Sequence, residues 1–295
     1  MVDVLSNNET FITPEALYPD RHRIYAKSLL DNSLKPHALS TGDVLSYDAI
    51  HPLGKGELSV IVPGTLEKEG MVKEVAVKIF MPVKGHEQDN EKFTREFETE
   101  KELLSTIDHP NIVKFLGKLK IGGLKGIVLE RLQKIDFSEK DSNQKLKDTS
   151  DMVSQIAEAL QVLVDNDEGL LVTDISDENI MRRDNGEFVL IDFVRKGKNP
   201  LYAPPELSVI GHENEVMQRA TPRSQVYSLG MVANKMLGGE LASEVDMSFG
   251  KFEPRKLTVP EEVNEVVKKA LSPDIANRYS DPVVFAEELN KTINH

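Results

Sequence analysis

Apolar positions in the first half of the chain recur with the short spacing of β-strands. Two strand-like runs between about residues 46 and 80 flank the turn-rich segment Glu67-Lys68-Glu69-Gly70, a pattern typical of antiparallel hairpins. Further apolar runs at residues 112–116 and 127–129 predict two more strands. We therefore expect a small antiparallel sheet in this part of the chain.

A helical period replaces this pattern at residues 90–107. Four side chains spaced by three or four residues share one face of the predicted helix: Phe93, Phe97, Glu100 and Leu104. The segment Asp108-His109-Pro110-Asn111 ends that helix. Beyond Gln133 the pattern is mainly helical, apart from a hairpin around Asp184-Asn185-Gly186. The predicted fold class is therefore α+β.

Length and composition are those of an ordinary globular protein. The 295 residues, 39% hydrophobic and 29% charged, are enough for one large two-lobed domain or for two smaller domains. Residues 1–45 mix Asn, Ser, Pro and charged positions, and Pro14 to Leu30 within them can form a helix that Thr13 caps. We treat residues 1–45 as an extension whose role is unknown.

The same composition excludes several classes of function. No apolar stretch approaches the roughly 20 residues that span a bilayer, and the N-terminus lacks the pattern of a signal peptide, so we expect a cytoplasmic protein with no transmembrane segment. Zero cysteines exclude disulfides, thiolate nucleophiles and cysteine metal sites. The formal net charge of −13 argues against binding to nucleic acid or anionic membranes, and it favours basic partners.

Four ordered motifs carry the candidate chemistry. A loop with Gly54, Gly56 and Ser59 lies between two predicted strands, and the run Val75-Ala76-Val77-Lys78 ends a further strand downstream. Downstream, Asp174 and Asn179 are five positions apart, and Asp192 follows Asp174 by eighteen. In order and spacing these motifs resemble the eukaryotic-type Ser/Thr protein kinase family.

The resemblance assigns roles to the polar residues. Asp174 would accept or orient the hydroxyl of a substrate, and Asn179 with Asp192 would hold Mg²⁺ against the phosphates of ATP. Lys78 needs a carboxylate partner, because an unpaired lysine at the end of an apolar strand is costly to desolvate. The family places that partner at Glu100, and Glu96, one turn earlier, is the competing candidate.

The resemblance also implies a two-lobed kinase fold with ATP and magnesium between the lobes. The first lobe and hinge would span residues 46–132, and the second lobe would span residues 133–295. The nucleotide would contact a glycine-rich loop, the two sides of an adenine pocket and the hinge backbone, at Gly54, Gly56, Ser59, Ile61, Ala76, Lys78, Leu129, Glu130, Leu132 and Met181. A buried ion pair between Glu206 and Arg278 would be structural.

Several positions depart from the family. Val172-Thr173 replaces the usual His-Arg, so the arginine that reads a phosphate on the activation segment is absent. That segment is short, and Tyr202 is the sole hydroxyl-bearing residue between Phe193 and Glu206. Ser176 stands in place of a lysine, which weakens neutralisation of the transition state. Gln225 replaces an aspartate that anchors a helix.

The leading expectation is ATP-dependent phosphoryl transfer to Ser or Thr of a protein substrate, without control by activation-segment phosphorylation. Activity would be constitutive or would depend on an activating protein partner. Two alternatives remain open: a nucleotide-binding pseudokinase that serves as a scaffold, and a kinase-fold transferase that acts on a small molecule or lipid. The absent arginine and short segment also loosely resemble secreted bacterial effector kinases, which act in a host cytosol.

Overall fold

The computed structural model describes residues 29–39, 41–55, 59–81, 87–121, 123–136, 141–166, 170–193, 199–208, 213–241 and 257–294. The chain divides into two compact units, which are Met1–Lys101 with Phe115–Arg131, and Glu102–Lys114 with Leu132–His295. Gly56 and almost all of the helix expected at Pro14 to Leu30 lie outside the described residues.

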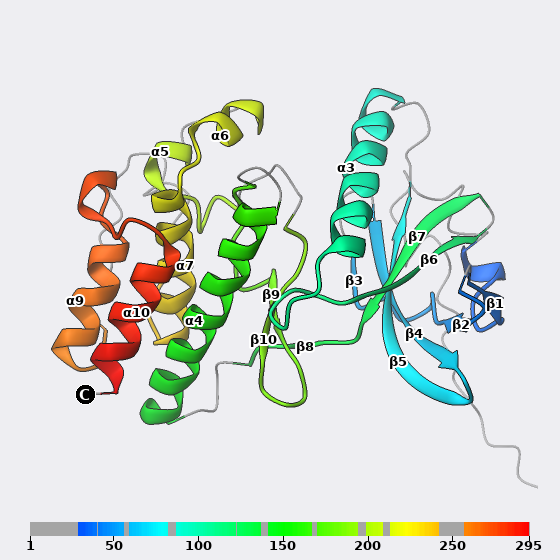
Figure 1. Ribbon diagram of the computed structural model, residues 1–295, viewed down its shortest axis with the longest axis horizontal. Coiled ribbons are helices and arrows are strands. Elements are labelled where there is room, and N and C mark those ends of the chain that lie inside the picture. The colour runs from blue at the N-terminus through cyan, green and yellow to red at the C-terminus, as the bar shows by residue number, and fades with distance from the viewer. Residues whose placement is uncertain are drawn as a thin grey trace, which may run out of the picture. The chain divides into compact units, whose positions relative to one another are not determined.

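The first unit is built on an antiparallel sheet (Figure 1). Its strands follow the order β1-β2-β4-β5-β7-β6, and β3 pairs with β4. The strands are β1 His37–Ala38, β2 Val44–Tyr47, β3 Gly54–Lys55, β4 Ser59–Lys68, β5 Met71–Phe80, β6 Phe115–Ile121 and β7 Leu124–Glu130. The antiparallel sheet expected from the apolar runs is therefore present.

A two-residue turn joins β4 to β5. Lys68 pairs with Met71, and between them Glu69 (φ 51°) and Gly70 (φ 76°) both have positive φ. Two successive positive φ values are typical of a type I′ turn, whose twist matches that of the flanking strands. The hairpin predicted around Glu67-Lys68-Glu69-Gly70 is confirmed.

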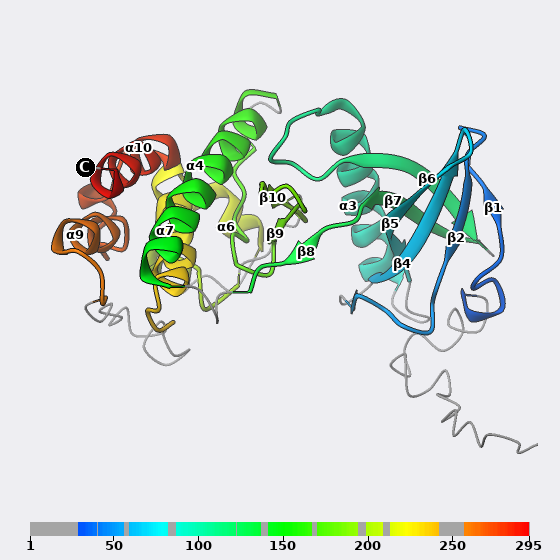
Figure 2. The same cartoon turned by 90° about the horizontal axis from the view of Figure 1, so that it is seen from below.

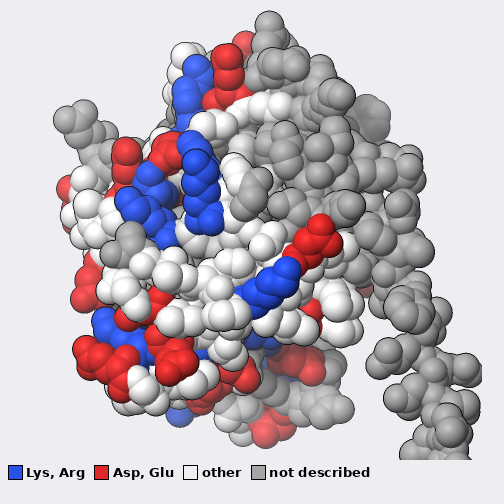
Figure 3. Space-filling model, turned by 90° about the vertical axis from the view of Figure 1, so that its right-hand side faces the viewer, with Lys and Arg blue, Asp and Glu red and all other residues white. Residues whose placement is uncertain are grey.

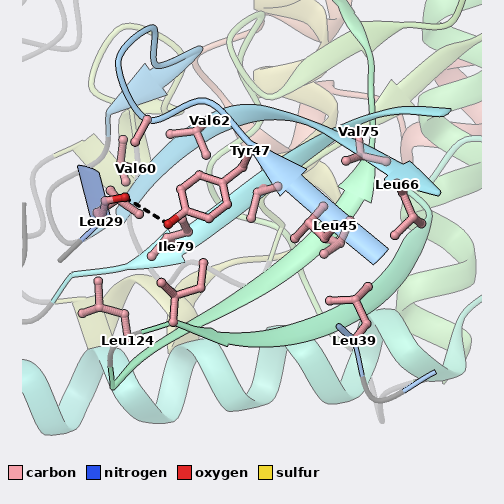
Figure 4. Packing of buried hydrophobic residues seen from close by; sticks show 14 of the residues in the cluster. Leu29, Leu39, Leu45, Tyr47, Val60, Val62, Leu66, Val75, Ile79 and Leu124 are labelled. Atoms are coloured by element: carbon pink, nitrogen blue, oxygen red, sulfur yellow. Dashed lines mark hydrogen bonds between the residues drawn. The ribbon is translucent and has the colours of Figure 1, made fainter. Parts of the chain in front are cut away.

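A hydrophobic core lies against one face of this sheet (Figure 4). The valines Val62, Val77 and Val128 are opposite one another on β4, β5 and β7, and all three are fully buried. Tyr47 of β2 is buried as well, and its hydroxyl donates a 3.0 Å hydrogen bond to the carbonyl of Leu29. Since Leu29 belongs to this core, the described residues before β2 form part of the first unit.

The helix α3 (Glu87–Thr106) confirms the helical period of residues 90–107. Phe97 packs against Phe80 of β5 with ring centroids 6.1 Å apart, and Glu100 and Leu104 are also buried. The side chain of Phe93 lies outside the described residues. The helix ends before His109-Pro110, as the sequence predicts.

The second unit is mainly helical (Figures 1 and 2). The helices α4 (Ser142–Asn166), α7 (Pro222–Met236) and α10 (Pro282–Ile293) pack against one another, and α9 (Glu261–Ala270) packs against α7 and α10. Every residue of α7 from Ser224 to Asn234 is buried, so α7 is the central helix. The remaining described helices are α5 (Pro205–Ser208), α6 (Glu213–Arg219) and the 3₁₀ helix η2 (Ile275–Asn277).

A three-stranded sheet accompanies these helices, in the order β10-β9-β8. Its strands are β8 Gln133–Lys134, β9 Ile180–Arg182 and β10 Phe188–Leu190. The antiparallel pairing of β9 with β10 across residues 183–187 confirms the hairpin expected around Asp184-Asn185-Gly186. Two further structural elements of the chain therefore follow its local sequence signals.

The strand predicted at residues 112–116 is wrong in position. The described strand β6 begins only at Phe115, and Ile112 forms an isolated parallel bridge with Leu190. The amide of Leu190 donates to the carbonyl of Asn111 (2.9 Å), and the amide of Val113 donates to the carbonyl of Leu190 (3.1 Å). The backbone of residues 111–113 is therefore satisfied within the second unit, where Ile112 and Val113 are buried.

Side chains of both signs lie on the face drawn in Figure 3. In the described part of the chain, no helix is long and apolar enough to cross a membrane. The large apolar side chains that are exposed there are Leu34, Ile50, Met71 and Val72.

Candidate active site

The register of β4, β5 and β7 collects several predicted nucleotide contacts on one face of the first sheet. Directly paired residues point to the same side of a sheet, and the side alternates at each residue. Ile61 and Ile127 lie opposite Lys78, and Leu129 lies opposite Ala76. These side chains therefore share the face that the valine core does not use. Such a face suits a nucleotide, because the apolar side chains can pack against its flat base and the cation can face its phosphates.

Lys78 and Glu100 form the ion pair that the sequence predicts. The Lys78 Nζ lies 2.8 Å from both carboxylate oxygens of Glu100, and the two side chains are only 12% and 9% exposed. The packing of Phe97 on Phe80 holds this part of α3 against β5. Because the pair is largely shielded from solvent, salt screens it weakly. The side chain of Glu96, the competing candidate, lies outside the described residues.

The other predicted contacts of the first unit lie on β3, β4 and β7 of the same sheet. Gly54 is opposite Ile61, and among the described residues a Cβ added at Gly54 would meet the Ile61 Cδ1 atom, at 3.9 Å. Ser59 begins β4, and Glu130, which ends β7, is buried.

Asp174 and Asn179 are linked directly in the second unit. The side-chain amide of Asn179 donates a 2.9 Å hydrogen bond to the backbone carbonyl of Asp174. The backbone amide of Asn179 donates to the carbonyl of Ser176 (3.1 Å), which closes a turn between them. Since the Asn179 nitrogen is engaged, its Oδ1 is the side-chain atom suited to a metal ion.

A further backbone bond brings the second aspartate to this loop. The amide of Ile191 donates to the carbonyl of Asn179 (2.9 Å), next to the Ile180–Leu190 pair of β9 and β10. Asp192 follows with φ 52°, a left-handed conformation that is uncommon outside glycine. Non-glycine residues in this region cluster at functional sites. A backbone hydrogen bond therefore joins the segment that contains Asp174 and Asn179 to the segment that ends in Asp192.

Two more predicted contacts lie in the second unit. Met181 is on β9, opposite Val189 of β10 and Lys134 of β8. Leu132 is buried just before β8. Gly56 cannot be placed with either set, because it lies outside the described residues.

Residues 47–292 match the family model of the protein kinase domain. This chain belongs to the protein kinase domain family. A probable serine/threonine-protein kinase of Clostridium perfringens is 22% identical to it over 275 residues, which cover 83% of this chain and 38% of that protein. The serine/threonine-protein kinase PrkC of Bacillus subtilis is 26% identical over 228 residues, which cover 70% of this chain and 34% of PrkC. The chain thus spans less than half the length of these two relatives.

A solved structure supports the fold. The PknI kinase domain of Mycobacterium tuberculosis, in a mutant form, aligns with a TM-score of 0.57 at 19% identity, over 88% of this chain and 98% of that one. The prediction of an α+β, two-lobed, kinase-like fold is therefore confirmed.

The residues fit the ATP and Mg²⁺ that the kinase family generally uses. No group of three or more His, Asp and Glu side chains able to hold a metal occurs among the described residues. A metal would be held by Asn179, Asp192 and oxygens of its ligand, a set that suits Mg²⁺. In the first unit, the apolar face around Ala76 and the Lys78 cation match a base and its phosphates.

The segment that precedes Asp174 is anchored to α7 despite its departures from the family pattern. Gln225, at the position of the usual aspartate, is buried, and its side-chain amide donates a 3.4 Å hydrogen bond to the carbonyl of Val172. Thr173, which replaces the arginine, is buried too. The anchor is therefore kept with a neutral side chain, and position 173 cannot present a cation to a phosphate.

A polar cluster that the sequence did not predict lies beside the same loop. Lys235 of α7 places its Nζ 2.5 Å from an Asp177 carboxylate oxygen and 3.2 Å from the Tyr202 hydroxyl, which itself donates to Asp177. Tyr202 is 2% exposed. Burial raises the pKa of its phenol, and the hydrogen bond to Asp177 raises that pKa further. The sequence carries no local signal for this cluster, because Asp177 and Lys235 are 58 positions apart.

The structural ion pair expected between Glu206 and Arg278 is present as well. Arg278 donates to both Glu206 carboxylate oxygens at 2.8 Å, and its side chain is completely buried. Its Nε also donates to the carbonyl of Ser272 (2.7 Å), and its guanidinium lies over the Tyr227 ring at 4.8 Å. This network joins α5 to α7 and to the chain before η2.

Proposed function

We propose that this kinase domain transfers the γ-phosphoryl group of ATP to Ser or Thr residues of a protein substrate. The observation that carries the proposal is the hydrogen-bonded chain from Asp174 through Asn179 to Ile191, which holds Asp174 and Asp192 on adjoining backbone. The matched relatives are described as serine/threonine-protein kinases, which supports Ser or Thr as the acceptor.

Each candidate residue has a distinct part in this proposal. Asp174 orients the acceptor hydroxyl and takes its proton, while Asn179 and Asp192 hold the cation. Lys78, aligned by Glu100, places a positive charge against the phosphates. Bound Mg²⁺ supplies charge neutralisation at the phosphates when it is present.

The proposal includes independence from activation-segment phosphorylation. Thr173 is buried where the phosphate-reading arginine would stand, and Tyr202 is the segment's sole hydroxyl-bearing residue. The Tyr202 hydroxyl already donates to Asp177, so a phosphate on it would lie against a carboxylate. We also propose that the domain acts in a cytosol.

One observation favours a second candidate, a nucleotide-binding pseudokinase. Ser176, at the position of the family's lysine, is 1% exposed, and its hydroxyl has no hydrogen-bond partner among the described residues. It therefore supplies no charge to a transition state. The residues proposed to bind ATP do not include Ser176. Binding of ATP without transfer of its phosphate is therefore the consistent alternative.

The decisive experiment is incubation with γ-labelled ATP and Mg²⁺, with one basic and one acidic protein as acceptors and with a lipid extract. We expect label on Ser or Thr for the parent and none for Asp174→Asn. Asp165→Asn, an exposed aspartate on α4, is the matched control and should label like the parent. Label on lipid alone would replace the protein acceptor, and ATP-dependent stabilisation without label on any acceptor would establish the pseudokinase.

A further inference from the structure

The proposed catalytic segment is a short loop. The middle of this loop is held by side chains from other parts of the second unit. The amide of Asn179 closes a turn on the carbonyl of Ser176, and Asp177 and Glu178 lie between them. Asn179 also holds the Asp174 carbonyl through its side chain. A group that fixes Asp177 therefore fixes the turn that relates the candidate base to the candidate metal ligand.

Two side chains from distant parts of the second unit fix Asp177. Lys235 comes from the last turn of α7, and Tyr202 comes from the segment before α5. The lysine contacts both the Asp177 carboxylate (2.5 Å) and the Tyr202 hydroxyl (3.2 Å), so the three groups form a closed triangle. The Lys235 ammonium also lies 5.9 Å from the centre of the Tyr202 ring.

The triangle has a rigid base. α7 is buried along most of its length, and the capping box of Thr221 and Ser224 fixes its start. The Asp177 and Lys235 side chains are 17% and 35% exposed, so the pair is partly withdrawn from water without being sealed from it. A charged pair of this kind holds geometry better than a fully exposed pair, which is screened and mobile.

We propose that Asp177, Tyr202 and Lys235 form a clamp that positions the catalytic loop, with Lys235 as its central positioning residue. The clamp rests on the proposed phosphoryl transfer and specifies how this domain orders its loop without an activation-segment phosphate. It joins α7, the end of the activation segment and the loop between Asp174 and Asn179 through unmodified side chains, with no added phosphate. Lys235 acts through Asp177 and not by contact with a substrate.

The test compares Lys235→Met, Lys235→Arg and the parent. We expect Lys235→Met to lower kcat at least about tenfold while KM for MgATP stays within about twofold, because the loop around Asp174 loses order while most of the proposed nucleotide contacts, on the first sheet and at Asp192, lie outside that loop. Lys235→Arg keeps the cation and should recover at least half of kcat. Lys268→Met, which removes an exposed lysine paired with Glu265 in the same unit, is the matched control and should match the parent.

A double-mutant cycle separates a clamp from three independent residues. Asp177→Asn and Lys235→Met together should cost no more than about threefold beyond the worse single variant, since each already breaks the triangle. If the two single losses in kcat multiply in the double variant, the residues act independently, and this result would overturn the clamp. An unchanged kcat in Lys235→Met, or equal losses in Lys235→Met and Lys235→Arg, would overturn it also.

Hydrogen exchange tests the clamp whether or not the parent transfers phosphate. The amide of Asn179, bonded to Ser176, should exchange at least about tenfold faster in Lys235→Met than in the parent, while amides of α4 do not change. Unchanged exchange at Asn179 would sink the clamp. A parent that shows no transfer with fast exchange in Lys235→Met would instead remove the proposed function and keep the clamp as a structural device.

Discussion

The Lys78 ammonium of β5 lies 2.8 Å from both carboxylate oxygens of Glu100 on α3. The pair joins the cation on the sheet face around Ala76 to the main helix of the first unit. Since both side chains are nearly buried, neither charge can be removed without consequence for the other.

Lys78→Met should lower phosphoryl transfer by about 100-fold or more, because it removes the positive group that the proposed function places against the phosphates. It also leaves Glu100 buried without its lysine, which costs up to about 3–5 kcal/mol of stability. Steady-state rates and urea unfolding measure the two effects separately.

The double variant Lys78→Met/Glu100→Gln is the control for stability, because it removes both charges. It should unfold closer to the parent than Lys78→Met does, yet remain inactive. Lys125→Met removes the lysine of the exposed Lys125–Glu98 pair between β7 and α3, and it should retain parental activity. Near-parental transfer by Lys78→Met would refute the assigned role of β5.

Metal binding and chemistry should separate at the two aspartates of the second unit. Asp192→Ala should lose the Mg²⁺-dependent thermal stabilisation by ATP, because Asp192 is a candidate ligand. Asp174→Asn should keep it, since ATP binding does not require the acceptor site. A ligand at about 100 times its Kd stabilises the folded state by roughly 2.7 kcal/mol, which a melting scan detects. The assignment fails if both variants shift alike.

Removal of phosphate should leave the activity of the purified domain unchanged. Phosphatase treatment, checked by mass spectrometry, is expected to alter the rate by less than about twofold, because no arginine stands at position 173 to read a phosphate. A drop above about tenfold that preincubation with MgATP restores would show phosphate control. Tyr202→Phe is unsuitable here, because it also breaks the bond to Asp177.

The Arg278–Glu206 pair should govern stability of the second unit. Arg278→Met leaves Glu206 with the hydrogen bond from the Ser224 hydroxyl but without its arginine, and it removes the donor to the carbonyl of Ser272, so we expect a loss of about 3–5 kcal/mol in urea unfolding. Arg278→Lys should recover only part of it, since a lysine cannot pair bidentately. The exposed Arg219 on α6 provides the control, and Arg219→Met should be neutral within about 0.5 kcal/mol. An equal loss in both methionine variants would contradict the assignment.

Part of the loss of stability at alkaline pH should come from ionisation of the Tyr227 phenol. Burial raises the pKa of its phenol to about 12, above the ordinary value of 10.0. The unfolded chain then releases the proton first, so the contribution of Tyr227 is complete below pH 10 and is lost as pH rises towards 12. Urea midpoints at pH 8 and pH 11.5 should differ less in Tyr227→Phe than in the parent. An identical difference in both proteins would show that Tyr227 does not ionise on unfolding.

Local spacing is enough to predict much of this kinase domain. The β4–β5 hairpin follows from a turn signal between apolar runs, and α3 follows from a period of three to four residues. Lys78 with Glu100, and Glu206 with Arg278, follow from motif order, and the structure contains both pairs. Elements and motif partners of this kind are encoded by short-range periodicity and family spacing.

Other features depend on which segments pack together. Ile112 lies in a strand-like run, yet its neighbours bond to Leu190 of the second unit, because that unit satisfies their backbone groups. Lys235 and Asp177 meet across 58 positions only because α7 packs as the central helix beside the loop between Asp174 and Asn179. Neither lysine nor aspartate carries a local mark of its partner, since an ion pair needs proximity in space and the chain sets that proximity only when its core has formed.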